Sequence, residues 1–192
     1  MSKLLTSLMV CAGVAFATSS GAATMSKDAY NAEMTRIKAD YKADREHCSG
    51  LSGNAKDICV ETAKGKEKVA KADADAAYEG TPKAREAARV ARADASYAVA
   101  KEKCDDFSGN AKDVCVKEAK AAEVKAKADA KVAHVANDTS RTASAKQLDA
   151  RKDAAEDKRD ANYKVAVEKC DSLTGDAKDQ CVKNAKVRYG KS

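Results

Sequence analysis

Three copies of a twelve-residue segment bounded by cysteines restrict the folding of this chain more than any other feature. The segments read CSGLSGNAKDIC at 48–59, CDDFSGNAKDVC at 104–115 and CDSLTGDAKDQC at 170–181. The spacers between them differ in length and sequence, whereas the interval between the two cysteines stays the same. A fixed segment between variable spacers indicates one supersecondary unit that the chain uses three times.

Each segment predicts the end of one helix, a tight turn and the start of a second helix. A glycine suits the left-handed residue that ends the first helix, and the Asn or Asp after it suits the N-cap of the second helix. An aspartate three residues after that N-cap approximates a capping box. The glycines are Gly53, Gly109 and Gly175, and the N-cap residues are Asn54, Asn110 and Asp176.

The paired cysteines lie at equal distances on either side of each turn. On two antiparallel helices they reach a similar height, and alanine-rich faces permit the Cα separation of about 5–6 Å that a disulfide needs. Six cysteines allow fifteen pairings, but the repeated interval predicts Cys48–Cys59, Cys104–Cys115 and Cys170–Cys181. Each disulfide would stabilise an otherwise marginal two-helix hairpin by about 2–3 kcal/mol.

A tyrosine precedes each first cysteine by seven residues, and an apolar residue follows it by three. The tyrosines are Tyr41, Tyr97 and Tyr163, and the apolar residues are Leu51, Phe107 and Leu173. These spacings place the tyrosine, the cysteine and the apolar residue on one face of the first helix. The tyrosines are predicted to fill the groove between the two helices, with the hydroxyl in water. A set of rings that stack on a ligand is the alternative.

The predicted fold is all-α, with three disulfide-clasped antiparallel helical hairpins and about six helices, elongated and coiled-coil-like. Helices are expected over 27–51, 55–78, 82–107, 111–135, 145–173 and 177–188. Thr81 is the predicted N-cap before Pro82 at a first helical position, and a polar break is expected over 137–144. The hairpin repeats therefore occupy 24–78, 82–137 and 145–192. The sequence leaves open whether they form one bundle or a string, and in which oligomeric state.

Residues 1–23 are predicted to be a secretory signal peptide. An uncharged apolar run over 4–17 follows a single lysine, and small residues come next, so cleavage is expected after Ala17, Ala22 or Ala23, with the later sites preferred. A lipoprotein signal ending at Cys11 is the alternative interpretation. We expect no transmembrane anchor after cleavage, and a periplasmic or extracellular protein in an oxidising compartment.

The charge pattern is not that of a nucleic-acid-binding protein. The chain has 36 basic and 30 acidic residues, a net charge of +6, and the two signs alternate along the predicted helices. Aromatic residues make up only 4% of the chain, and no nucleic-acid-binding motif occurs in it. Large apolar residues are scarce, which favours disorder, but the helix propensity of Ala, Lys, Glu and Arg favours long helices with a thin core.

The sequence predicts no catalytic site, no cofactor and no metal site. The interval between paired cysteines is longer than the Cys-x-x-Cys of redox sites, which favours structural disulfides. His47 stands beside the first segment, where the other repeats have Lys103 and Lys169, and His134 is alone on a charged helix. Both histidines are therefore interpreted as solvated. Clustered carboxylates offer only weak, non-specific sites for divalent cations.

The signal peptide, the Ala/Lys/Asp-rich helices, the pattern Cys…Gly-Asn/Asp-Ala-Lys-Asp-x-Cys and the short Arg/Tyr/Gly/Lys tail resemble a group of small proteobacterial proteins. These are labelled TolA-like cell-envelope biogenesis proteins, and the resemblance covers essentially the whole mature chain. To TolA itself the resemblance is compositional and limited to its Ala/Lys-rich helix. The resemblance implies a role at the cell envelope.

The combined features predict a non-enzymatic structural or interaction protein of the periplasm. It would be a scaffold or spacer of disulfide-linked helices that docks an unknown protein or envelope partner. The alternative is an envelope-stress protectant or weak chaperone of the hydrophilic helical type. Circular dichroism separates the two, because a scaffold should be helical in dilute buffer and melt cooperatively, whereas such a protectant should be largely disordered until dried or crowded.

Overall fold

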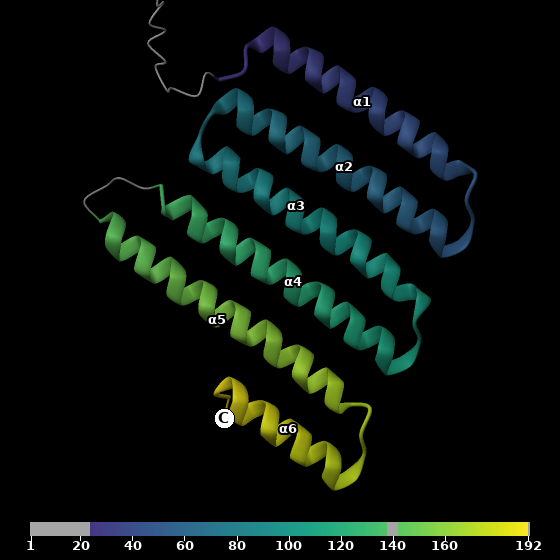
Figure 1. The fold of residues 1–192 in the computed structure, drawn as a ribbon, viewed down its shortest axis with the longest axis vertical. Helices are drawn as coiled ribbons and strands as arrows, with labels where there is room; N and C mark the ends of the chain where they lie inside the picture. Colours follow the sequence, from purple (N-terminus) through teal and green to yellow (C-terminus); the bar gives the residue numbers. More distant parts are fainter. Residues whose placement is uncertain (1–23, 138–141, 192) are drawn as a thin grey trace, which may run out of the picture.

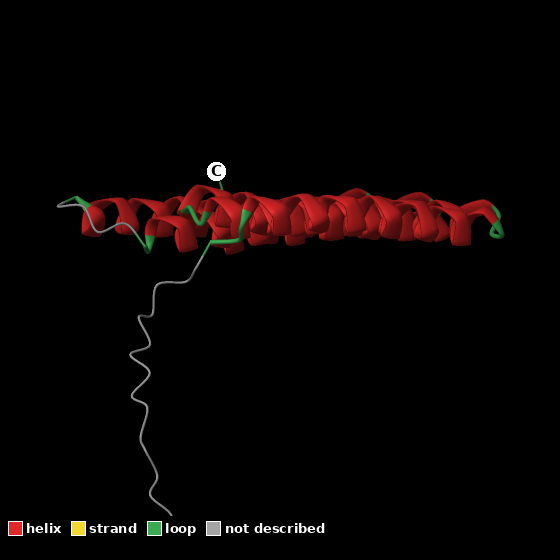
Figure 2. Cartoon of the chain, turned by 90° about the horizontal axis from the view of Figure 1, so that it is seen from above, coloured by secondary structure: helices red, strands yellow, loops and turns green. Residues whose placement is uncertain are grey.

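In the part of the chain that the structure describes, six α-helices lie side by side in a single flat layer (Figures 1 and 2). The structure is a computed structural model that describes residues 24–137 and 142–191, so the predicted signal peptide lies outside the described residues. The helices are α1 (Lys27–Ser49), α2 (Gly53–Glu79), α3 (Pro82–Lys103), α4 (Gly109–Val135), α5 (Ala143–Cys170) and α6 (Gly175–Tyr189). A short 3-10 helix, η1 (Cys104–Asp106), follows α3. The described residues contain no strand, which confirms the all-α prediction.

Helices that follow one another in the chain pack against one another. The main contacts join α1 to α2, α2 to α3, α3 to α4, α4 to α5 and α5 to α6. Seen edge-on, the described helices form one layer (Figure 2). The three hairpins therefore form neither a bundle nor a string of separate rods, because they lie next to one another within a single plate. Both faces of this plate remain open among the described residues.

Residues at the helix ends explain where α2 ends and α3 begins. Gly80 takes the left-handed conformation that ends α2, with φ of 64°. The Thr81 hydroxyl then accepts a hydrogen bond from the Ala84 amide at 3.0 Å, and Pro82 occupies the first turn of α3. These predictions are confirmed. The predicted polar break over 137–144 covers most of the gap between α4 and α5, but α5 already begins at Ala143; residues 138–141 lie outside the described residues.

The core of the plate consists largely of small side chains. Most of the buried residues are alanines, and the largest fully buried side chains are Cys48, Cys104 and Cys170. Because a helix in a single layer is covered only on its flanks, it can bury two narrow stripes and no broad face. Small residues in these stripes let neighbouring helices approach closely. At Gly65, for example, an added Cβ would lie only 3.0 Å from the Cβ of Ala95.

The apolar residues after the first cysteines do not lie on the helix face predicted for them. The first helix of each hairpin ends within a residue or two of its cysteine, and α3 tightens there into η1. Leu51, Phe107 and Leu173 consequently lie in the turns, where 40%, 54% and 40% of their surface is exposed. The prediction was wrong because it continued the helical period past the point at which the chain turns.

No described helix combines the length and the apolar character that a membrane span requires.

Candidate functional site

The three predicted disulfides are present. Cys48 bonds to Cys59, Cys104 to Cys115 and Cys170 to Cys181, with Cα atoms 5.6, 5.6 and 5.7 Å apart. The first cysteine of each pair is buried and the second is half-buried. Each bond joins the two helices of one hairpin beside the turn, which fits a structural role.

The predicted turn caps are half right. Gly53, Gly109 and Gly175 have φ values of 56°, 56° and 57°, the left-handed conformation that glycine adopts without strain. However, the N-cap positions are Ser52, Ser108 and Thr174. The second helix of each hairpin thus begins earlier than predicted, and Asn54, Asn110 and Asp176 lie inside its first turn. The predicted N-caps are therefore wrong, because each glycine opens the second helix.

The two asparagines instead connect one hairpin to the next. Asn54 Nδ2 donates a hydrogen bond to Asp106 Oδ1 at 2.7 Å, and Asn110 Nδ2 donates to the backbone carbonyl of Glu168 at 3.0 Å. Asp176 stands at the same position of the last hairpin, beyond which the described chain has no further hairpin. Sequence spacing alone gave no signal for these long-range bonds.

The predicted tyrosines lie half-buried in the grooves between helices. The Lys120 ammonium sits 5.0 Å from the centroid of the Tyr97 ring, and the rings of Tyr163 and Tyr189 meet edge to face at 6.3 Å. Tyr41 lines a groove between α1 and α2. The three residues therefore pack between helices as predicted, each with different neighbours.

The two histidines occupy different environments. His47 is exposed, as predicted, whereas His134 is half-buried, and its Nδ1 lies 3.2 Å from Glu86 Oε2 of α3. The interpretation of His134 as a solitary solvated residue is therefore wrong, because α3 packs beside it. Within the described residues, no group of three or more His, Cys, Asp or Glu side chains is arranged to hold a metal ion.

Ion pairs cross the middle of the plate. The carboxylate of Asp94 on α3 lies 2.5 Å from Lys68 of α2 and 2.6 Å from Lys127 of α4. Burial would raise the pKa of Asp94, but hydrogen bonds from Lys127 and Lys68 outweigh it and hold that pKa below its usual value. Glu123, whose side chain is 5% exposed, contacts Lys120 and Lys127 at 2.7 and 2.6 Å. The same balance lowers its pKa.

Grooves between adjacent helices open on one face of the plate. Arg92, Ser96 and Ala100 line both the α2/α3 groove and the α3/α4 groove. Ala122 lines the α3/α4 groove and also the groove between α4 and α5. Because neighbouring grooves share lining residues, all three lie on the same side, which we call the groove face.

The α2/α3 and α4/α5 grooves are equivalent in the repeat. They have volumes of about 560 and 480 Å³. Three lining positions show how they differ, because Thr62, Val69 and Ser96 of the α2/α3 groove correspond to Glu118, Lys125 and Asn162 of the α4/α5 groove. At these three positions the first groove carries small or apolar groups and the second carries charged or amide groups. Lys66, Arg92 and Lys103 also line the first groove.

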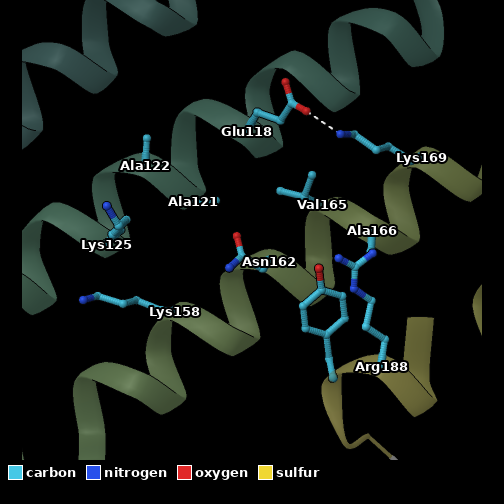
Figure 3. A pocket seen from close by; sticks show the side chains of 11 residues that line it. Glu118, Ala121, Ala122, Lys125, Lys158, Asn162, Val165, Ala166, Lys169 and Arg188 are labelled. Carbon is cyan, nitrogen blue, oxygen red and sulfur yellow. Dashed lines mark ion pairs between the residues drawn. The ribbon is translucent and has the colours of Figure 1, made fainter. Parts of the chain in front are cut away.

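The end of α6 completes the α4/α5 groove (Figure 3). Arg188 extends over the groove beside Ala166, and Lys125 and Lys158 lie at its other end (Figure 3). Asn162 projects between them (Figure 3). This arrangement brings side chains of three helices together, and none of these four residues was predicted from the sequence to belong to a site.

Comparison of the chain with protein-family models, with curated proteins and with solved structures found no match.

Proposed function

We propose that this protein is a non-enzymatic scaffold of the bacterial periplasm that docks a partner at the cell envelope. The observation that carries the proposal is the open plate of three disulfide-linked hairpins (Figures 1 and 2). A single layer of helices buries little apolar surface for its length, but it presents two extended, pre-ordered faces. Such a shape is suited to contact with other molecules.

The disulfides support a non-cytoplasmic location. Each of the three hairpins carries a disulfide beside its turn, and such bonds persist in oxidising compartments. The predicted signal peptide and the resemblance to TolA-like envelope proteins point to the periplasm. Exposed charged residues of both signs along the helices would keep the plate dissolved there.

The first experiment is non-reducing peptide mapping of protein purified from the periplasm. Full yield of the three pairs Cys48–Cys59, Cys104–Cys115 and Cys170–Cys181 is expected. Free thiols, or pairs between different hairpins, in the periplasmic protein would contradict the scaffold of separately linked hairpins.

Site-specific photocrosslinking then tests the docking role. A photoreactive residue placed at Ser96, on the groove face, should give one discrete adduct in intact cells. The adduct should disappear in a variant that lacks all six paired cysteines, because a scaffold presents its surface only when it is folded. Absence of any adduct from Ser96, and from further positions on both faces, would contradict a docking function.

A further inference from the structure

We propose that α1 binds α6 of a second copy of this chain, so that copies join head to tail and continue the plate. This inference goes beyond the scaffold role and does not depend on it. The two helices lie at opposite edges of the plate, and each packs on a neighbouring helix along one flank (Figure 1). The argument rests on the residues of the other flank, which we call the free flank of α1 and of α6.

The internal junctions show how one hairpin contacts the next. At the α2/α3 junction, a Cβ added to Gly65 would lie 3.0 Å from the Cβ of Ala95. At the α4/α5 junction, Lys117 Nζ lies 3.6 Å from Glu168 Oε2. In both cases the second helix of one hairpin meets the first helix of the following hairpin. Ala95 and Glu168 therefore mark the flank that a first helix turns toward the preceding hairpin.

The free flank of α1 carries the same residues as this flank of α3 and α5. At equal distances from the first cysteine, the three first helices share two alanines and a glutamate. These are Ala32, Ala39 and Glu46 in α1, Ala88, Ala95 and Glu102 in α3, and Ala154, Ala161 and Glu168 in α5. All of them are buried or half-buried on α3 and α5, whereas those on α1 are exposed. Thus α1 has a contact surface that no helix covers among the described residues.

The free flank of α6 carries the other half of these contacts. Val187 stands at the position of Gly65, and Lys183 stands at the position of Lys117. With 76% of its surface exposed, Val187 is the most exposed large apolar residue that the structure describes. Among the described residues, neither Lys183 nor Glu46 has an ion-pair partner. An apolar side chain and a cation are therefore available on this flank.

A second copy in the plane of the plate brings the two free flanks together. First and second helices run antiparallel throughout the plate, so α6 of one copy can lie against α1 of the next as in the internal junctions (Figure 1). Val187 then faces Ala39, and Lys183 faces Glu46. No turn links the two copies, so the distance between their helices can adapt to valine. The contact joins apolar surfaces and opposite charges.

This contact should be reversible. With 15 residues, α6 is shorter than α2 and α4, which have 27 each, so it covers only part of α1. Gln180 also replaces the apolar Ile58 and Val114 of the equivalent positions. We therefore expect association that grows with protein concentration. Because the contact joins two different surfaces at opposite edges, further copies can add to form an open row.

Carbodiimide crosslinking of the mature, oxidised protein tests the contact, with isotope-labelled and unlabelled copies mixed in equal amounts. Lys183 and Glu46 belong to helices at opposite edges of the plate, so a crosslink between them must join two copies (Figure 1). The expected product includes pairs that combine a labelled and an unlabelled peptide. The crosslink between Lys117 and Glu168 forms within one copy and is the internal control for the reagent.

Sedimentation equilibrium measures the strength of association. The average mass should rise with concentration and should not level off at a dimer. Ala39→Lys places a charge against Val187 and should weaken association by about tenfold or more. The matched control is Ala87→Lys, an exposed alanine of α3, which has a neighbouring helix on both flanks. This control should change the association less than twofold.

Three results would overturn the proposal. The first is a monomer at every concentration, or no crosslink between Lys183 and Glu46 where the internal control forms. The second is a closed dimer crosslinked through α1 of both copies, and the third is equal weakening by the two alanine variants. If Ala39→Lys proves unfolded by circular dichroism, charge reversal takes its place. Glu46→Lys and Lys183→Glu should each weaken association, and the double variant should restore it.

Discussion

The α2/α3 junction and the α4/α5 junction join successive hairpins through equivalent contacts, yet they present different surfaces. In the first junction Arg92 pairs with Asp73 at 2.5 Å, and in the second Lys158 pairs with Asp129 at the equivalent positions. The groove positions above these pairs differ, with Val69 in one and Lys125 in the other. The comparison shows that contacts between helices repeat while the residues exposed in the grooves vary, so the variable positions are where a specific function can reside.

The disulfides should have the largest effect on stability, and their removal tests whether the junctions alone hold the plate. We expect Cys104→Ala with Cys115→Ala, and Cys170→Ala with Cys181→Ala, each to lower the free energy of unfolding by about 2–3 kcal/mol. The structural consequences should differ, because α6 packs mainly on α5 whereas α4 packs on both α3 and α5. Hydrogen exchange should therefore show α6 losing protection in the second variant while α1 to α5 keep theirs. Full protection of α6 would show that its contacts with α5 suffice.

The buried carboxylate of Glu123 should have the next largest effect. Because its pKa is lowered in the folded protein, ionised Glu123 contributes stability above the unfolded pKa of about 4.3, and this contribution is lost as the pH falls through the lowered value. We expect Glu123→Gln to cost about 1–2 kcal/mol at pH 7 and clearly less at pH 3. Urea unfolding at both pH values measures the difference.

Glu67 provides the control for that prediction. It occupies the equivalent position in the first hairpin but pairs with a single lysine, Lys71, at 2.6 Å and is more exposed than Glu123. Glu67→Gln should therefore cost clearly less at pH 7. Equal costs would mean that the two-lysine contact of Glu123 adds nothing beyond one ion pair.

The distance between helices at the two junctions should give smaller effects, which two opposite substitutions test. Gly65 of the first junction has the Cβ of Ala95 only 3.0 Å from the position of its own missing Cβ, whereas the second junction has Ala121 at the equivalent place. Gly65→Ala should lower stability by about 1 kcal/mol despite the better helix propensity of alanine, because α2 and α3 must move apart. Ala121→Gly should also cost about 1 kcal/mol, through propensity alone. A stabilised Gly65→Ala variant in thermal melts would refute the tight packing.

The asparagines that connect neighbouring turns should have the smallest effects. Asn110 donates to a backbone carbonyl in a partly buried site, and Asn54 donates to the exposed carboxylate of Asp106. We expect Asn110→Ala to cost about 0.5–1 kcal/mol and Asn54→Ala less than about 0.5 kcal/mol in urea unfolding. The reverse order would show that the carboxylate bond at the first junction is the stronger of the two.

The sequence by itself determined the local features of this protein. Cysteine spacing determined the disulfide pairs, because both members of each pair flank the same turn. The glycine conformations and the Thr81–Pro82 helix start also followed, since each depends on residues only a few positions apart. The predicted N-caps were wrong by two residues, because Gly53 and its counterparts belong to the second helix and not to the end of the first.

Only the tertiary structure decided how the hairpins are arranged and which side chains meet. Helical periodicity specifies which residues share a face, but not whether a neighbouring helix lies beside that face or on top of it. The flat layer fits the buried alanines on two flanks of an inner helix, as at Ala88 and Ala93 of α3. The groove lined by Lys125, Asn162 and Arg188 likewise forms from three helices that are far apart in sequence and close in space. Interactions between residues that are close in sequence do not specify such contacts. The candidate site could therefore be identified only from the tertiary structure.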